Sequence, residues 1–230
     1  VGGPPHRFGS TGGSTSPISG AAACTLRVAF VTPELLSLVR RTNLAEVAEC
    51  LPLALRQRNV DARVFLPYSS DIDPNAIADL RLAGKVRVPD GSGPGGSNQV
   101  EVEVFTGLSG TLPVVLMSEP KLFRSRHPYG DENGPYEDNW RRFSVFARAI
   151  LESFSLLGFA PAVIHCMDWT AGLVPLFRRT DYLQKDVKHP VSKAGIFFSF
   201  QNIAMQGSFE RQILPEIGVH VDLFKNINGI

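Results

Sequence analysis

In the first third of the chain, short β-prone apolar runs alternate with a segment whose apolar residues are spaced as in a helix. Leu26–Thr32 is a run of β-branched and aromatic residues, which predicts a strand. In Leu44–Arg58 the apolar residues recur at spacings of three and four, which predicts an amphipathic helix with Thr42 or Asn43 as its N-cap. Asp61–Leu66 is again β-prone and is followed by a proline. The opening of the chain therefore predicts a strand, a helix and a second strand.

The middle of the chain has a different pattern. Three short β-prone segments, 80–88, 99–106 and 112–117, are separated by glycine-rich turns, which predicts hairpins or an extension of a sheet edge. Residues 90–97 are rich in glycine, but no lysine follows them and both flanks are β-prone. We therefore interpret them as a hairpin tip and not as a phosphate-binding loop.

The second half returns to alternation of helix and strand. Asp138 to about Leu157 has an apolar stripe at helical spacing, and a short apolar run at 162–164 predicts a buried strand. Helical spacing resumes from Trp169, and Ala194–Phe200 predicts a fourth core strand. The remaining residues, 208–230, suit one or two short helices.

These elements together predict an α/β fold. We expect a Rossmann-like, three-layer domain over residues 24–230, with a mostly parallel sheet and an extra hairpin region. The polar segment His165–Asp168 lies where a strand gives way to a helix. In open parallel sheets ligands bind at that edge, so a site is expected there. Adjacent strand residues point to opposite sides, so His165, Cys166 and Asp168 are not expected to share a metal ion.

Net charge, cysteine spacing and the length of apolar runs argue against several classes of function. The 230 residues carry a net charge of +1, which gives no reason to expect nucleic acid or an anionic membrane as a partner. The pair Arg141 and Arg142 is interpreted as a solvated helix face. Three widely spaced cysteines without a CxxC pair suggest neither a disulfide framework nor a zinc site, so no metal or cofactor is expected. No apolar run approaches the roughly 20 residues that span a bilayer, so the protein is not expected to be transmembrane.

Residues 1–23 differ from the rest of the chain. They are rich in Gly, Ser, Thr and Pro, and they carry Arg7 but no acidic residue. This composition is typical of a mitochondrial or plastid transit segment, which favours an organellar location. A flexible linker explains the same composition equally well.

Four blocks in order carry a resemblance to a known family. They are LAEVAECLPLAL at 44–55, YEDNWRRFSVFARAILE at 136–152, HCMDWTAGL at 165–173 and QNIAMQG at 201–207. The chain resembles the N-terminal half of bacterial glycogen synthase and plant starch synthase, glucosyltransferases that use a nucleotide-activated glucose. The resemblance implies two Rossmann-like domains facing across a cleft, of which this chain is the first. That first domain would hold the growing glucan.

The chain departs from the family pattern at two places. The glycine-rich KTGGL loop of the family, which approaches the nucleotide sugar, falls on Arg40, Arg41, Thr42, Asn43 and Leu44, and both glycines are replaced. Glycine allows positive φ and close approach of the backbone to phosphate, so we interpret this loop as degenerate. Gln201 replaces the histidine that contacts the transferred sugar in the family.

Other positions keep the family pattern. With Gln201, the resemblance makes Asp138, Asn139, Asp168, Trp169 and Asn202 vestigial cleft or glucan-binding residues. A structural interpretation stands beside this one: Asp138 and Asp168 would cap the following helices, and Trp169 would pack between them.

These departures lead to a hypothesis about function. The chain is interpreted as a non-catalytic relative of the synthases, with no catalytic residue, that serves as a structural subunit with other protein subunits in a larger assembly. Two alternatives stay open. The chain is an excerpt of an active nucleotide-sugar-dependent glucosyltransferase, or it is a regulator that keeps weak glucan binding.

Overall fold

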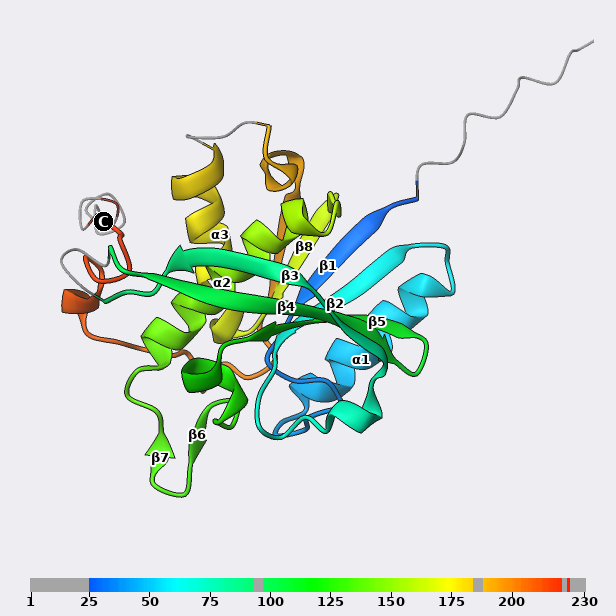
Figure 1. Ribbon diagram of the computed structural model, residues 1–230, viewed down its shortest axis with the longest axis horizontal. Helices are drawn as coiled ribbons and strands as arrows, with labels where there is room; N and C mark the ends of the chain where they lie inside the picture. The colour runs from blue at the N-terminus through cyan, green and yellow to red at the C-terminus, as the bar shows by residue number, and fades with distance from the viewer. Residues whose placement is uncertain (1–24, 93–96, 184–187, 221–222, 224–230) are drawn as a thin grey trace, which may run out of the picture.

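The computed structural model describes residues 25–92, 97–183, 188–220 and 223. Its main feature is a seven-stranded sheet in the order β3-β4-β5-β2-β1-β8-β9 (Figure 1). The strands are β1 (Arg27–Val31), β2 (Asp61–Pro67), β3 (Ala78–Pro89), β4 (Gln99–Ser109), β5 (Leu112–Ser118), β8 (Val163–Met167) and β9 (Gly195–Ser199). Strands β5, β2, β1, β8 and β9 run parallel to one another, and β3 and β4 are antiparallel.

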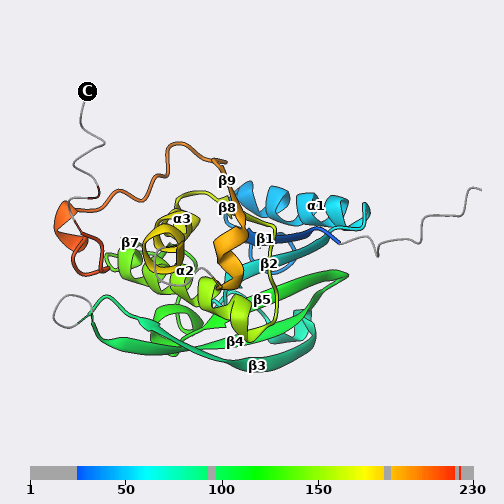
Figure 2. The ribbon, with the colours of Figure 1, turned by 90° about the horizontal axis from the view of Figure 1, so that it is seen from above.

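Helices cover both faces of the sheet. α1 (Leu44–Arg56) lies on the opposite side of β1 and β2 from α2 (Asn139–Leu156) and α3 (Leu173–Phe177) (Figure 2). The sheet residues alternate between two cores: Val28 and Phe30 face α1, whereas Ala29 and Val31 face α2. This is the period of two that a strand requires when both faces are buried. The predicted three-layer, Rossmann-like α/β fold is confirmed.

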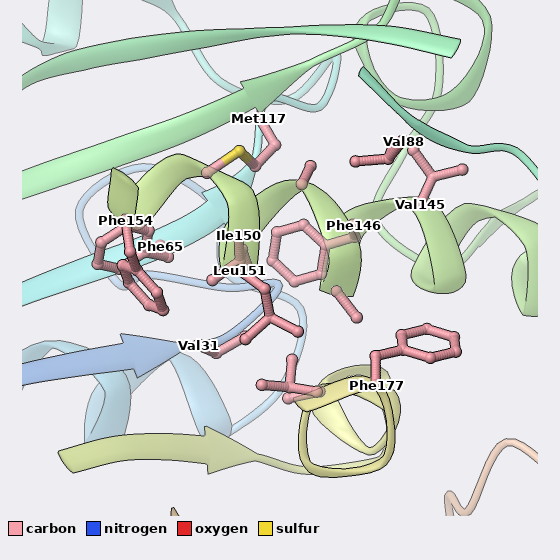
Figure 3. Packing of buried hydrophobic residues seen from close by; sticks show 14 of the residues in the cluster. Val31, Phe65, Val88, Met117, Val145, Phe146, Ile150, Leu151, Phe154 and Phe177 are labelled. Atoms are coloured by element: carbon pink, nitrogen blue, oxygen red, sulfur yellow. The ribbon is translucent and has the colours of Figure 1, made fainter. Parts of the chain in front are cut away.

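The larger core lies between the sheet and α2. Every third or fourth residue of α2 is an apolar side chain that is fully buried, as the periodicity of its sequence predicts. Figure 3 shows these side chains packed on strand residues and on α3; the labelled residues are Val31, Phe65, Val88, Met117, Val145, Phe146, Ile150, Leu151, Phe154 and Phe177. This packing fixes the start of α2 beside the carboxyl end of the sheet.

The hairpin region is confirmed and is larger than predicted. β3 and β4 pair over most of their length, and β4 turns directly into β5, which joins the parallel strands beside β2. Residues 90–92 and 97–98 close the β3–β4 hairpin through a hydrogen bond from Asp90 N to Asn98 O of 2.9 Å. The centre of the predicted tip, 93–96, lies outside the described residues.

Several local predictions need correction. β9 is the last strand of the sheet and is half exposed, so it is not a core strand, because no strand among the described residues pairs with its outer edge. The predicted helix from Trp169 is broken into a 3₁₀ turn (Trp169–Ala171), α3 and a π turn (Arg178–Leu183). The segment before α2 also contains local structure that the pattern did not predict, a π turn (Pro120–Arg124) and a small hairpin, β6 (Gly130–Asp131) with β7 (Gly134–Pro135).

Parts of both ends of the chain lie outside the described residues. Residues 1–23, predicted to be a transit segment or linker, lie outside the described residues. The predicted helical region after 208 contains a 3₁₀ turn, Arg211–Ile213, in its described part. No helix in the part of the chain that the structure describes is both long and apolar enough to cross a bilayer.

Candidate functional site

The carboxyl ends of the five parallel strands lie along one edge of the sheet. Because β1 pairs with β2 on one side and with β8 on the other, the chain winds away from β1 in both directions. Such a reversal point opens a crevice between two loops, which is where ligands bind in sheets of this type. Here the two loops are 32–43, after β1, and 168–172, after β8.

Glu34 shapes the loop after β1. Its side chain is buried, and one carboxylate oxygen accepts hydrogen bonds from the backbone N–H groups of Arg41 and Thr42, both at 2.7 Å. The other oxygen accepts the Thr42 hydroxyl at 2.9 Å. An internal carboxylate therefore accepts the hydrogen bonds of two backbone N–H groups of this loop.

This arrangement changes the interpretation of the loop that replaces KTGGL. None of Arg40, Arg41, Thr42 and Asn43 has a positive φ, and Asn43 is right-handed helical at φ −68°. The loop thus needs no glycine to adopt its path, and the replacement of both glycines costs no backbone strain here. Asn43 precedes α1 but makes no capping hydrogen bond through its side chain; the Thr42 hydroxyl accepts from Leu44 N at 3.2 Å instead.

Tyr129 links this loop to the rest of the site. Its hydroxyl donates a hydrogen bond to Glu34, and its ring lies 6.3 Å from that of Trp169, centroid to centroid. Burial and the neighbouring Glu34 carboxylate raise the pKa of the Tyr129 phenol well above its ordinary value. The phenol therefore stays protonated and donates at all physiological pH values.

Asp168 joins the ends of β8 and β9. Its Oδ1 accepts from Gln201 N at 2.6 Å and, more weakly, from Asn202 N at 3.4 Å. Its own backbone is at φ 57° and ψ −179°, a region that residues other than glycine rarely occupy. The Asp168 side chain makes no capping hydrogen bond to the following turn, where Ala171 N donates to the backbone oxygen Asp168 O at 3.1 Å instead, so its predicted role as a side-chain cap is wrong. The carboxylate instead fixes the loop that follows β9.

Asp138 and Asn139 belong to a second network, at the start of α2. Asp138 accepts two hydrogen bonds of 2.7 Å from Arg126 and does not cap α2 through its side chain, which corrects that prediction. Burial alone would raise the pKa of Asp138, but the Arg126 hydrogen bonds outweigh it and hold this pKa below its usual range. The Asn139 amide donates to Tyr129 O at 2.7 Å, so it positions the segment that carries Tyr129.

The two networks meet at a pair of adjoining pockets. The first, of about 410 Å³, is rich in aromatic and amide side chains and is lined by Tyr129, Pro135, Tyr136, Asn139, Trp169, Ala204, Met205, Gln206, Gly207, Ser208 and Phe209. The second, of about 440 Å³, is mostly apolar; it shares Asn139, Trp169, Gly207 and Phe209 with the first and extends under residues 210–217. Trp169 packs edge-on against Phe143 of α2 at 4.9 Å, as the structural interpretation predicted.

Other candidates do not form a reactive centre. His165 Nε2 is 2.8 Å from Ser199 Oγ, and burial lowers the pKa of His165 and raises the pKa of the Cys166 thiol to about 12. Both residues are thus neutral and buried. Within the described ranges, no three His, Cys, Asp or Glu side chains are grouped so that they could hold a metal ion.

The sequence placed some of these residues but missed others. Asp168, Gln201 and Asn202 do contact one another, and Asn139 and Trp169 line the same pockets. Glu34 and Tyr129 were missed, although they connect the loops on both sides of the crevice. A signal for Glu34 was present: it is a lone charge directly after an apolar strand, at the edge where sites form.

Replacing Glu34 by glutamine tests its role in the loop. With its amide oxygen on the N–H groups of Arg41 and Thr42, glutamine places its NH₂ toward the Thr42 and Tyr129 hydroxyls, so the Tyr129 hydroxyl loses its carboxylate acceptor and the remaining hydrogen bonds lose their charge. We expect the free energy of unfolding to fall by about 1.5–3 kcal/mol, the range for hydrogen bonds to a charged group. Urea unfolding followed by circular dichroism measures this change. Glu46→Gln, in an exposed pair with Arg40, is the control and is expected to change stability by less than about 1 kcal/mol.

Comparison with known proteins gives the chain relatives over nearly its whole described length. The family described as "Starch synthase catalytic domain" matches residues 27–230. Glycogen synthase of Geotalea uraniireducens is 32% identical over 201 residues, which is 86% of this chain and 40% of that protein. Glycogen synthase of Aeromonas hydrophila is 34% identical over 196 residues, 84% of this chain and 38% of that protein. The chain thus spans about 40% of the length of these curated relatives.

A solved structure agrees with this result. The catalytic domain of starch synthase IV from Arabidopsis thaliana, bound to ADP and acarbose, superposes with a TM-score of 0.75 at 26% identity. The superposition covers 87% of this chain and 38% of that one.

These relatives correct the hypothesis of a protein without catalysis. The prediction that the chain is not an enzyme is wrong, because the proteins that it matches are named glycogen synthase, which is an enzyme, and nothing in the structure shows that catalysis is lost. The altered loop, from which the prediction was drawn, has an unstrained path held by Glu34. The fold, the relatives and the family match over residues 27–230 agree: the chain belongs to the starch synthase catalytic domain family of glycosyltransferases.

Proposed function

We propose that this chain is the acceptor-side domain of an active glucosyltransferase, which adds glucose from a nucleotide sugar to an α-glucan. The observation that carries the proposal is the aromatic and amide-lined pocket beside Asp168, at the carboxyl edge of the parallel strands. The relatives named glycogen synthase and the starch synthase bound to ADP and acarbose support it. A second, nucleotide-binding domain would face this edge across a cleft.

The pocket suits a sugar chain. Tyr129, Tyr136, Trp169 and Phe209 offer flat apolar surfaces on which the apolar faces of glucose rings can pack. Gln206 and Ser208 add polar groups at the same wall, where sugar hydroxyls can form hydrogen bonds. A pocket with a mainly apolar lining and a few convergent polar groups is typical of a small-molecule site.

The domain would contribute to glucose transfer mainly by orienting the acceptor glucan. In the transfer, the bond between glucose C1 and the nucleotide phosphate breaks, a bond from C1 to a glucan hydroxyl oxygen forms, and the hydroxyl proton leaves with the phosphate. Asp168 holds the backbone of Gln201 and Asn202 after β9, and Glu34 holds the loop of Arg40–Asn43 after β1, so these two segments at the carboxyl edge have a fixed shape. Fixed loops place the acceptor without a reorganisation cost during the reaction.

Truncation of Phe209 tests the proposed site. Phe209 is 38% exposed and lies 6.1 Å from the Trp169 ring, so Phe209→Ala removes one wall of the pocket with little loss of core. We expect the affinity for maltohexaose to fall about five- to tenfold, equivalent to ~1–1.4 kcal/mol of aromatic contact. Isothermal titration of the purified chain with maltohexaose measures this affinity. The natural polypeptide that contains the domain is expected to transfer glucose from ADP-glucose to glycogen.

The control is Leu82→Ala. Leu82 is an apolar side chain on β3 that is 49% exposed and does not line either pocket. This variant is expected to bind maltohexaose as the unaltered chain does. The proposal is wrong if the natural polypeptide transfers no glucose, or if Phe209→Ala binds maltohexaose unchanged.

A further inference from the structure

A pair of charged side chains holds one wall of the aromatic pocket from outside the pocket. Each carboxylate oxygen of Asp138 accepts one hydrogen bond of 2.7 Å from Arg126. The same guanidinium lies over the ring of Tyr136, with its central carbon 3.9 Å from the ring centroid. Tyr136 lines the aromatic pocket, whereas neither Arg126 nor Asp138 lines either pocket. Arg126 is therefore placed to act on the pocket through Tyr136.

The backbone at this wall is fixed by other contacts. Tyr136 N donates to Tyr129 O at 3.1 Å, and Tyr136 O accepts from Asn139 N at 3.2 Å. The carbonyl oxygen of Asp138 accepts from Arg142 N at 3.0 Å, which ties this residue to the first turn of α2. The path of the chain thus does not depend on the guanidinium that covers the ring.

The Tyr136 side chain is held less firmly than its backbone. It is partly exposed, and its hydroxyl accepts a long hydrogen bond of 3.3 Å from His127 N. Arg142 lies 4.9 Å from the ring centroid, but its N–H groups are directed to four other acceptors. Pairing with both oxygens of Asp138 fixes the plane of the Arg126 guanidinium, and the ring beneath it is fixed in turn. Without this guanidinium the ring gains rotamer freedom, which binding of a ligand must then remove.

We propose that Arg126 and Asp138 are positioning residues of the glucan pocket, which hold the Tyr136 ring in place before the glucan binds. This role rests on the proposed function, because it concerns the same pocket and the same ligand. Asp138 then acts on the acceptor through Arg126 and Tyr136, and it does not itself contact the glucan. A wall that is already in place lowers the cost of ordering on binding, so the pair contributes to glucan affinity and leaves the transfer step unchanged.

Arg126→Gln tests this role. The substitution removes the charge and the pairing with two oxygens but keeps a polar side chain. We expect the affinity of the purified chain for maltohexaose to fall about three- to tenfold, within the range for ordering one more side chain on binding. Arg126→Lys keeps a cation near the ring but cannot hold both carboxylate oxygens in the same plane, so it should recover part of the loss. Isothermal titration measures both affinities.

A double-mutant cycle with Tyr136 separates positioning from direct contact. In the Tyr136→Ala background the ring is absent, so Arg126→Gln is expected to change the maltohexaose affinity by less than about twofold. Direct contact between Arg126 and the glucan would instead give the same loss in both backgrounds. The natural polypeptide gives a second readout: Arg126→Gln should raise the KM for glycogen and leave kcat and the KM for ADP-glucose unchanged.

Arg63→Gln is the matched control. Arg63 also pairs with both oxygens of one carboxylate, that of Asp61 at 2.9 and 3.0 Å, and it lies 4.3 Å from the centroid of the Phe159 ring. None of these three residues lines either pocket. The variant is expected to lose about as much stability in urea as Arg126→Gln and to bind maltohexaose as the unaltered chain does. The control therefore removes general destabilisation as an explanation for weaker binding.

The possible outcomes are distinct. Unchanged maltohexaose affinity in Arg126→Gln, or an equal loss in the Tyr136→Ala background, overturns the positioning role. If Arg126→Gln does not fold, Asp138→Asn takes its place in the same cycle with the same expectations. If the unaltered chain does not bind maltohexaose, the proposed function and the positioning role fail together. If the unaltered chain binds and Arg126→Gln binds equally well, only the positioning role fails.

Discussion

Arg142→Leu is expected to lower the free energy of unfolding by about 3–5 kcal/mol, the range for breaking a buried charged network. The guanidinium is almost fully buried and serves four acceptors: the carbonyl oxygens of Leu122, Pro128 and His127, and Asn139 Oδ1, at 2.7–3.2 Å. Leucine fills part of the space but leaves these acceptors without a donor. Urea unfolding of the purified variant measures the loss.

The reason for this large effect is that Arg142 holds an irregular segment. Residues 120–138 contain little regular structure, and α2 supplies the donors that its carbonyl groups lack. Burial lowers the pKa of Arg142 to about 10, so the side chain is still charged at neutral pH.

The neighbour Arg141 provides the control. Arg141 pairs with Asp90 through a side chain that is 33% exposed, and Arg141→Leu should cost less than about 1 kcal/mol. Arg142→Lys is expected to recover only part of the loss, because one ammonium group cannot reach all four acceptors. If Arg142→Leu lowers the free energy of unfolding by less than about 1 kcal/mol, water forms the hydrogen bonds to the carbonyl groups of residues 120–138, and Arg142 does not hold this segment.

Gly207→Ala is expected to disrupt the proposed glucan pocket. Gly207 has φ +58°, and a Cβ added there would lie 2.0 Å from Trp169 Cε3, well inside contact distance. The left-handed backbone costs an alanine about 1–2 kcal/mol, and the clash forces either Trp169 or residues 203–209 to move. We expect the affinity for maltohexaose to fall at least about tenfold, because both residues of this contact line both pockets, as do Asn139 and Phe209. Isothermal titration and tryptophan emission report the two effects.

Gly110 is a matched control for Gly207. It has the same φ of +58°, but a Cβ added there meets nothing within 4 Å. Gly110→Ala therefore carries the backbone strain without the clash, and it should bind maltohexaose normally. If the two variants lose stability equally and Gly207→Ala still binds maltohexaose normally, the contact with Trp169 does not shape the pocket.

The fold was largely predictable because its signals are local. The short β-branched and aromatic run of β1 and the apolar period of three to four in α1 and α2 are visible in the residues themselves, and each pattern favours one kind of element. The helix after β8 was predicted as regular but is broken, because Pro175 has no N–H to donate to the preceding turn and the Trp169 ring packs against Phe143 and Phe209. The position of β9 at an edge was not visible, since strand order depends on pairing between distant segments.

The candidate site was predictable only in part. Asp168, Gln201 and Asn202 were found because their blocks resemble the family, and they do meet at the ends of β8 and β9. Their roles were not predictable: Asp138 and Asp168 look like helix caps in sequence, yet each bonds a partner on another segment. Arg142 looked like half of a solvated basic pair but is buried, because adjacent residues of a helix point about 100° apart: Arg141 points to Asp90, whereas Arg142 points to residues 120–138.

The sequence by itself determined the elements, the α/β class and the edge of the sheet at which a site forms, because these follow from side-chain period and strand direction. Only the tertiary structure decided which polar groups satisfy one another: Glu34 with the loop of Arg41 and Thr42, Tyr129 with Glu34, and Asp71 with Arg41 and His127. The physical reason is distance along the chain. A hydrogen bond between residues 95 positions apart, as between Glu34 and Tyr129, leaves no periodic trace in the sequence and forms only when packing brings its two ends together.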